Sequence, residues 1–238
     1  MIKELDRNIW VSEQPLRYFG LNVGTRMTII RLSHGELAII SPIQPTPEMV
    51  AQLGKLGEVG HIIAPNLYHY LFAEDFKKLY PKALFWATSG LKLKKPNYSI
   101  DRIIANDEGV LWNGLEHMFF DGFKTLDLRG FVPLNEWVFF HSLTRTLILT
   151  DAAFNFDESF PALTQFAARL IGGYKNLSPS LLERVATTEK ERVRRSVEKI
   201  LNWDFERVIM AHGSIVEENA KQQLKLGYED FLGKPIHS

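Results

Sequence analysis

The sequence contains no cysteine, which excludes disulfide bonds, thiolate metal ligands and a cysteine nucleophile. It also has no excess of charge: 28 lysines and arginines balance 28 aspartates and glutamates, so no overall field favours nucleic acid or an anionic membrane. No apolar stretch reaches the roughly 18 residues of a membrane-spanning helix. The residues from Met1 to Asp6 include acids where a signal peptide would need a basic start and an apolar block. We therefore expect a cytoplasmic protein that binds neither nucleic acid nor membranes.

The sequence also lacks the short motifs of several large enzyme classes. It has no glycine-rich loop of the Rossmann or Walker type, so these two modes of nucleotide binding are not expected. Ser142 and Ser214 lie close in sequence to His141 and His212, but neither serine has the G-x-S-x-G context that exposes a nucleophile. A serine hydrolase is therefore not expected.

What the sequence does have is enough material for a large core. Its 238 residues are 45% hydrophobic, as in ordinary globular proteins, and they predict a single domain over residues 1–238. The 16 phenylalanines and 5 tryptophans are many for this length, and they indicate a thick core or an aromatic-lined pocket.

Strands and helices alternate in the first half of the chain. Short apolar runs at 37–40 and 61–64 predict buried strands, because a strand covered on both faces has no polar alternation. Thr46 followed by proline predicts the start of a helix. Asn66 is placed to cap a second helix that begins at Leu67.

The second half opens with a block of strands and closes with helices, and Thr188 with Glu191 predicts a capping box in this part. This order predicts an α/β (α+β) fold with four layers, an αββα sandwich in which two β-rich halves pack together with helices outside. A doubly wound sheet is the alternative.

Two predicted strands end in side chains that suit acid–base or metal chemistry. The apolar run from Leu147 to Leu149 ends at Thr150 and Asp151, and the run from Val208 to Ala211 ends at His212. Open α/β folds place their chemistry at the carboxyl ends of strands, so these two side chains mark the expected site.

These residues resemble the metallo-β-lactamase family. That family has, in order, a strand ending in Asp, a strand ending in T-H-x-H-x-D-H, a G-H-T-P-G turn, a strand ending in G-D and a late strand ending in His. Here the strand at 37–40 ends in Ser41, residues 61–70 occupy the position of the histidine motif, and residues 130–133 resemble the proline turn. Asp151 matches the bridging acid and His212 the final histidine. The resemblance implies a four-layer fold and a metal-dependent hydrolase.

The chain departs from the family at most of the metal ligands. Asp151 and His212 are retained, and His69 lies in the metal loop one position out of register. The remaining ligand positions carry Asn66, Tyr68, Tyr70, Leu71 and Phe131. The resemblance is therefore to a functionally unnamed branch with a degenerate metal-binding motif.

The candidate metal ligands are His69, Asp151 and His212, of which Asp151 and His212 are also the candidate catalytic residues. Three ligands and a water suit one catalytic metal ion such as zinc, manganese or iron, whereas two metals are not expected. His117 and His141 are candidates for an additional ligand, although ordinary strand histidines are the simpler interpretation. A hydrogen-bonded Asp–His pair that ties two strand ends is the alternative for the whole group.

Two functions follow. The favoured one is a non-classical or inactive member of the family whose former active-site pocket binds a small molecule or a partner. The alternative is a mononuclear metal-dependent hydrolase of an ester, amide or phosphoester. In both cases the residues expected to line the pocket are Asn66, Tyr68, Tyr70, Phe131, Phe154 and Phe156.

Overall fold

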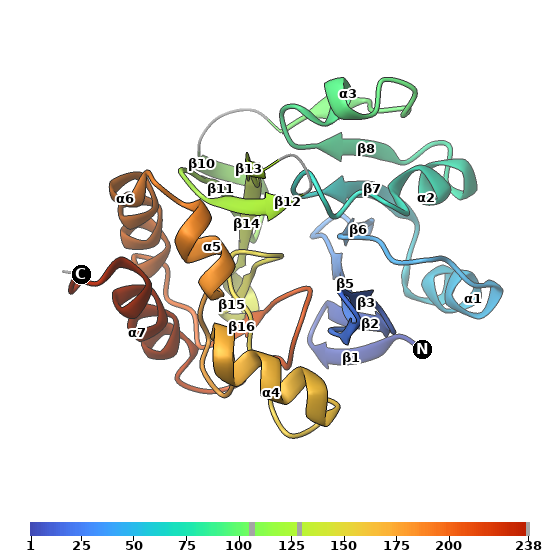
Figure 1. Cartoon of the computed structure of the whole chain (residues 1–238). Coiled ribbons are helices and arrows are strands. Elements are labelled where there is room, and N and C mark those ends of the chain that lie inside the picture. Colours follow the sequence, from blue (N-terminus) through green and yellow to red (C-terminus); the bar gives the residue numbers. More distant parts are fainter. Residues whose placement is uncertain (105–107, 128–129, 237–238) are drawn as a thin grey trace.

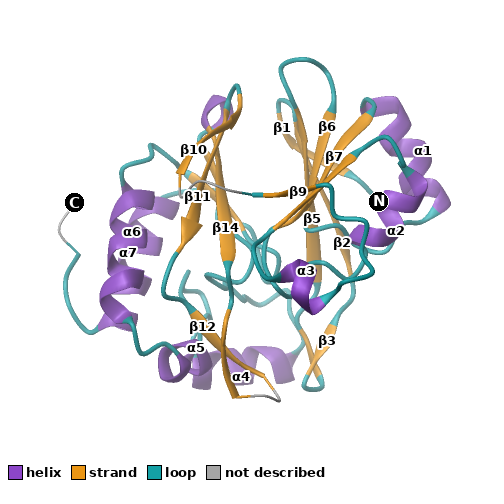
Figure 2. Cartoon of the chain, turned by 90° about the horizontal axis from the view of Figure 1, so that it is seen from above, coloured by secondary structure: helices purple, strands orange, loops and turns teal. Residues whose placement is uncertain are grey.

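Two β-sheets pack face to face, and helices cover the outer side of each (Figures 1 and 2). The structure is a computed structural model that describes residues 1–104, 108–127 and 130–236. Figure 2 shows α6 and α7 outside one sheet and α1 and α2 outside the other. The predicted four-layer αββα sandwich is confirmed, and the doubly wound alternative is wrong because the strands divide between two sheets.

The first sheet is formed by the N-terminal part of the chain. Its last four strands run parallel, so their carboxyl ends meet at one edge. In spatial order its seven strands are β1 (Lys3–Asp6), β2 (Ile9–Gln14), β5 (Thr25–Arg31), β6 (Leu37–Ile40), β7 (Val59–Ala64), β8 (Leu84–Ala87) and β9 (Arg102–Ile103).

The second sheet is mostly antiparallel, but its last two strands are parallel neighbours, as expected for two strand ends that meet. In spatial order its five strands are β10 (Glu108–Trp112), β11 (Leu115–Phe120), β14 (Glu136–His141), β15 (Thr146–Ile148) and β16 (Arg207–Ile209).

The remaining elements are two short hairpins, the helices and one 3-10 turn. The hairpins pair β3 (Arg17–Tyr18) with β4 (Leu21–Asn22) and β12 (Lys124–Asp127) with β13 (Gly130–Pro133). The helical elements are α1 (Pro47–Leu56), α2 (Ala73–Leu79), α3 (Leu91–Lys94), η1 (Ser142–Thr144), α4 (Ala162–Ile171), α5 (Leu181–Ala186), α6 (Lys190–Leu201) and α7 (Ala220–Leu232). No helix in the described ranges combines the length and apolar composition that crossing a bilayer requires.

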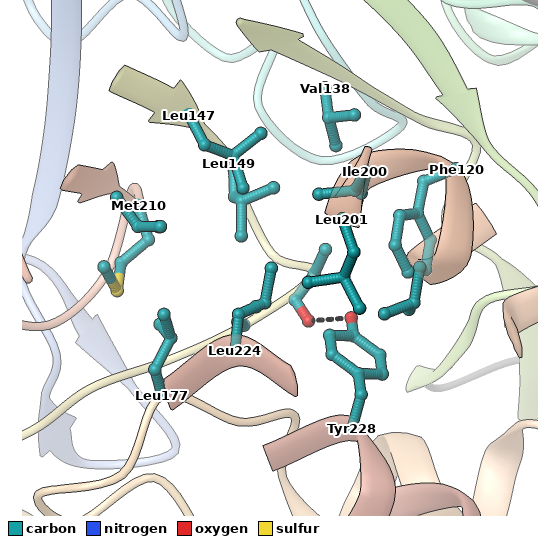
Figure 3. Close-up of a cluster of buried hydrophobic side chains, with 14 of the residues drawn as sticks. Phe120, Val138, Leu147, Leu149, Leu177, Ile200, Leu201, Met210, Leu224 and Tyr228 are labelled. Carbon is teal, nitrogen blue, oxygen red and sulfur yellow. Dashed lines mark hydrogen bonds between the residues drawn. The ribbon is translucent and has the colours of Figure 1, made fainter. Parts of the chain in front are cut away.

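Three hydrophobic clusters lie between the four layers. Ile62 of β7 packs toward α1 and α2, whereas the next residue, Ile63, packs between the two sheets. Leu147 and Ile148 of β15 divide in the same way, Leu147 toward α6 and α7 and Ile148 between the sheets. Successive side chains point to opposite faces of a strand, so these uninterrupted apolar runs fill two cores at once. Figure 3 shows the outer cluster, where Tyr228 donates a hydrogen bond to the carbonyl of Ala152.

Two helix starts differ from the predictions. The helix predicted from Leu67 is wrong, because residues 67–72 form turns and α2 begins only at Ala73. The capping box predicted at Thr188 is also wrong: α6 begins after Glu189 and has no side-chain cap. A capping box is found instead at the start of α5, between Ser180 and Glu183.

Candidate functional site

His69, Asp151 and His212 converge at one end of the interface between the sheets. The distance from Asp151 Oδ1 to His69 Nε2 is 3.3 Å, and to His212 Nε2 it is 3.4 Å. The two Nε2 atoms lie 3.1 Å apart. Three ligand-type atoms from segments 82 and 61 residues apart in the chain therefore form a nearly equilateral triangle.

The topology brings these residues together. His69 follows β7, Asp151 follows β15, and His212 follows β16, whose parallel pairing with β15 sets their two loops side by side. Ser41, which follows β6, joins them because β6 and β7 are also parallel neighbours. The site is therefore built where the carboxyl ends of strands from both sheets meet, as open α/β folds commonly arrange.

Asn66 is the link between the metal-loop segment and the acid. Its side-chain oxygen accepts hydrogen bonds from the backbone N–H groups of Tyr68 and His69, each at 2.8 Å. Its Nδ2 donates to Asp151 Oδ2 at 2.8 Å and to Glu136 Oε2 at 3.2 Å. The turn at residues 66–70 does not continue as a helix. The N–H of Tyr70 bonds to the carbonyl of Tyr68 and not to that of residue 66, as an α-helix would require. Asn66 is fully buried and positions both His69 and Asp151.

Glu136 is a residue of the site that sequence reasoning missed. It is fully buried at the start of β14, and its carboxylate accepts bonds from the backbone N–H groups of Thr150, Asp151 and Ala152 at 2.7, 2.8 and 3.2 Å. Burial, with a contribution from the charge of Asp151, raises the pKa of Glu136. The only signal in the sequence was an acid directly before four apolar residues of the same strand. The carboxylate fixes the turn that presents Asp151.

Hydrogen bonds fix the orientation of both imidazoles. His212 Nδ1 lies 2.5 Å from the carbonyl oxygen of Gly24, so this nitrogen carries the proton and donates it. In the neutral ring of His212, Nε2 then carries a lone pair that points toward the other two atoms of the triangle. His69 Nδ1 lies 2.6 Å from the hydroxyl of Ser41, which can donate or accept. Such outer partners orient metal-binding histidines in known sites.

The charges around the triangle suit a cation. Burial by itself would raise the pKa of Asp151, but the imidazoles of His69 and His212 outweigh it and hold the pKa of Asp151 below its usual range. The carboxylate is therefore ionised at neutral pH. When His69 donates its Nδ1 proton to Ser41, the Nε2 lone pairs of both rings face each other at 3.1 Å and repel unless a proton or a cation lies between them. A metal ion satisfies the carboxylate and both lone pairs together.

The loop that carries His212 is held by Arg26 of β5. The buried guanidinium donates to the carbonyls of Met210 and Gly213 at 2.5 and 2.7 Å, and it pairs with Glu13 at 2.7 Å. Gly213 has a φ of +93°, and a Cβ there would overlap the carbonyl oxygen of Asn155. Only glycine therefore fits beside His212 in this conformation.

A cavity of about 430 Å³ opens beside the triangle, and His69, Asp151 and His212 lie in its wall. Of the residues expected to line a pocket, Tyr68, Phe154 and Phe156 lie in this wall.

The structure places the other three residues that were expected to line a pocket outside this wall. Asn66 lies behind the wall, because its polar atoms bond to the protein interior. Tyr70 is buried in the core under α2, and Phe131 is 54% exposed on β13, away from the cavity.

His117 and His141 do not join the triangle. His117 is buried in β11, where its ring packs against Trp137 and its Nδ1 lies 3.0 Å from the carbonyl of Gly109. His141 Nδ1 lies 2.7 Å from the hydroxyl of Thr144. Both are strand histidines, as the simpler interpretation held.

A second group of potential ligands joins His34, Glu36 and His61, near the opposite ends of β6 and β7. Glu36 Oε2 lies 3.0 Å from His34 Nε2 and 3.3 Å from His61 Nε2. Trp86 Nε1 donates to His61 Nδ1 at 3.1 Å, so the proton of neutral His61 lies on Nε2 and faces the carboxylate. His61 therefore has no lone pair to offer a metal, and the group is a carboxylate shared by two histidines.

Comparison with known proteins supports the fold. Residues 6–176 match the family described as "Domain of unknown function (DUF4336)". The DIM-1 metallo-β-lactamase is 13% identical, with 97% of each chain covered and a TM-score of 0.67. The metallo-β-lactamase FIM-1 from Pseudomonas aeruginosa in its mono-zinc form is 8% identical, with 98% of this chain and 96% of that chain covered and a TM-score of 0.63.

The Flv1 flavodiiron core from Synechocystis sp. PCC6803 is 15% identical, with 98% of this chain but 60% of that chain covered and a TM-score of 0.66. No curated protein matches the sequence. The fold implied by the family resemblance is therefore confirmed. At these identities the likeness shows the fold alone.

Proposed function

The chain belongs to the DUF4336 family and has the metallo-β-lactamase fold, and on that premise we propose that it is a hydrolase that depends on one divalent metal ion. His69, Asp151 and His212 are the ligands. The observation that carries the proposal is the triangle of donor atoms with edges of 3.1, 3.3 and 3.4 Å. Around a tetrahedral ion with bonds of about 2.0–2.1 Å, neighbouring ligand atoms lie about 3.3–3.4 Å apart. The triangle therefore fits one face of such a site.

The proposal is for one metal. In the family resemblance Tyr68, Leu71 and Phe131 stand where further ligands would be, and none of these side chains binds zinc well. Tyr68 and Leu71 line the cavity instead. Two histidines and one carboxylate also form the ligand set of several mononuclear iron sites, so the identity of the ion is decided by measurement.

A bound divalent ion supplies Lewis-acid activation of water or of the scissile bond. The chain itself orients the ligands: Asn66 holds the second oxygen of Asp151, and Gly24 and Ser41 hold the outer nitrogens of the two imidazoles. In the reaction the oxygen of one water bonds to the acyl carbon or phosphorus, and the bond to the leaving group breaks. The leaving group takes one proton of the water and the solvent takes the other.

Metal analysis of protein purified without chelator tests the proposal. We expect about one equivalent of zinc, manganese or iron, and loss of most of it in His69→Ala, Asp151→Asn and His212→Ala. His34→Ala is the matched control, because it removes an imidazole from the second group of potential ligands and should leave the metal bound. The proposal would be contradicted if the protein contained less than about a tenth of an equivalent of metal and bound no added metal on titration to micromolar concentrations.

A metal-free binding pocket is the second candidate function, and the cavity wall favours it. Most of the lining side chains are aliphatic or aromatic, as in ordinary small-molecule sites. In this case the protein would bind an apolar compound equally well with and without metal, and Asp151→Asn would leave that binding unchanged.

A further inference from the structure

The cavity is apolar well beyond the metal-binding triangle. Its wall is made by the β3–β4 hairpin, residues 68–72, residues 154–156 and helices α4 and α5. The aliphatic and aromatic side chains that form most of this wall include Val23, Phe72, Phe154, Phe156, Ile171 and Leu182. A volume of about 430 Å³ lies in the range of pockets that enclose drug-sized molecules.

Polar groups of the wall are largely engaged within the protein. Thr164 donates to the carbonyl of Asn22, and Thr125 donates to the carboxylate of Glu183. The same carboxylate accepts the backbone N–H of Ser180 in the capping box of α5. Because these groups already have hydrogen-bond partners within the protein, they do not require polar groups on a substrate. The metal-binding triangle is then the polar part of the wall that would orient a ligand.

Away from the proposed ion, the wall offers little stabilisation to an anionic substrate. Arg17 is the only lysine or arginine among the described residues that line the cavity, and it is exposed at the start of β3 with its Nε bonded to Asn22. Two acids, Asp151 and Glu183, lie in the same wall. The proposed divalent ion would offset Asp151 and would itself attract an anion, but an anion such as a phosphate would also have to leave water for a wall that is otherwise mostly apolar and carries Glu183, which is unfavourable.

The mouth of the cavity is apolar as well. Phe19 and Leu71 line it and are 76% and 58% exposed. On α4, Phe166 and Leu170 are exposed beside the lining residues Ala167 and Ile171. Figure 2 shows β3, β12, α4 and α5 gathered at one end of the molecule. Exposed apolar surface around a groove is typical of a site that takes up hydrophobic ligands.

We propose that the cavity takes an uncharged carboxylic ester or amide with a hydrocarbon acyl chain, whose carbonyl lies at the triangle and whose chain lies along the apolar wall. This substrate class rests on the proposed hydrolase function. Hydrolysis would cleave the single bond between the acyl carbon and the ester oxygen or amide nitrogen. Water would supply the hydroxyl of the released fatty acid and the proton of the released alcohol or amine. Of the three substrate classes that the family resemblance leaves open, the wall selects the acyl compounds over the phosphoesters.

A chain-length series tests the proposal on the full chain. Binding of acetamide, hexanamide and decanamide is measured by calorimetry with zinc-loaded and with metal-free protein. We expect affinity to rise about three- to fourfold for each added CH₂ until the cavity is filled, as burial of each CH₂ from water predicts. A flat series, or a kcat/KM for 4-nitrophenyl phosphate above that for 4-nitrophenyl decanoate, overturns the substrate class even when the metal is bound.

The series also separates the two proposals. A steep series without any hydrolysis of 4-nitrophenyl decanoate supports the acyl pocket and contradicts the hydrolase. Two neighbouring leucines on α5 provide a matched pair: Leu182 lines the cavity, whereas Leu181 does not. They are 36% and 46% exposed, so the fold tolerates a charge at either position. Leu182→Asp should flatten the series and Leu181→Asp should leave it steep; equal effects count against the proposed wall.

Discussion

Replacing Asn66 by alanine should both destabilise the fold and weaken metal binding. The side chain donates to the carboxylates of Asp151 and Glu136 and accepts two backbone N–H groups. A hydrogen bond to a charged group contributes about 1.5–3 kcal/mol, and a neutral one about 0.5–1.5 kcal/mol. The backbone groups of Tyr68 and His69 are only partly buried and regain water, so the two carboxylate bonds dominate. We expect a loss of about 3–5 kcal/mol in the free energy of unfolding.

That loss is a large share of the roughly 5–15 kcal/mol that stabilises a typical domain. Urea denaturation followed by tryptophan fluorescence measures it, on metal-free protein so that ligand binding does not contribute. Asn202→Ala, at an exposed asparagine after α6, is the control and should change the free energy of unfolding by less than about 0.5 kcal/mol. In a titration, Asn66→Ala should lower metal affinity about 10- to 100-fold, as loss of an outer partner does elsewhere.

The reasoning would be refuted by a loss below about 1 kcal/mol for Asn66→Ala, close to that of the asparagine control. That result would mean that the two carboxylates do not depend on the Asn66 amide. A normal metal affinity in a destabilised variant would contradict only the second half of the argument. It would show that Asp151 keeps its position without the amide.

Three further substitutions test the surroundings of the site. Gly213→Ala should lower the free energy of unfolding by at least about 1–3 kcal/mol and should also lower metal affinity. Gly233→Ala is the control, because Gly233 also has a positive φ but has open space around it, and this variant should bind metal normally. Denaturation and metal titration compare the two variants. Arg26→Met removes two charge-assisted bonds to the 210–213 loop and should lower the midpoint of thermal denaturation and metal affinity together. Burial raises the pKa of Glu183, so the folded state binds its proton more tightly than the unfolded state and stability falls as the pH rises above about 4.3; Glu183→Gln should flatten urea stabilities measured from pH 4.5 to pH 8.

The sequence was sufficient to predict the layers of the fold because the signals for buried strands are local. The runs at 37–40 and 61–64 and the run that begins at Leu147 fill cores on both faces, and that is why they contain no polar alternation. The ends of such runs also located Asp151 and His212, since parallel neighbouring strands end at the same edge. In the structure Asp151 Oδ1 and His212 Nε2 lie 3.4 Å apart.

The supports of the site could not be predicted, because they join segments far apart in the chain. Arg26 reaches the carbonyl of Met210 across 184 residues, and His212 bonds to Gly24 across 188. An arginine near the start of a strand carries no sign of such a partner in the sequence. Asn66 was recognised as a cap, but local propensity could not show that its amide would bond to Asp151 and that its turn would stop short of a helix.

The position of the site explains why so much of the chain supports it. Gly24, Ser41 and His69 lie in loops next to strands of the seven-stranded sheet, whereas Asp151 and His212 lie in loops that follow strands of the five-stranded sheet. An ion bound to both histidines and the carboxylate would therefore tie the two sheets together at this edge. Because metal that binds only the folded state adds its binding free energy to folding, the proposed metal should raise the free energy of unfolding of the whole domain. Without a cation, hydrogen bonds from the protein alone have to hold the ionised carboxylate and the two facing imidazoles in place. This need accounts for the many hydrogen bonds that orient the three ligands.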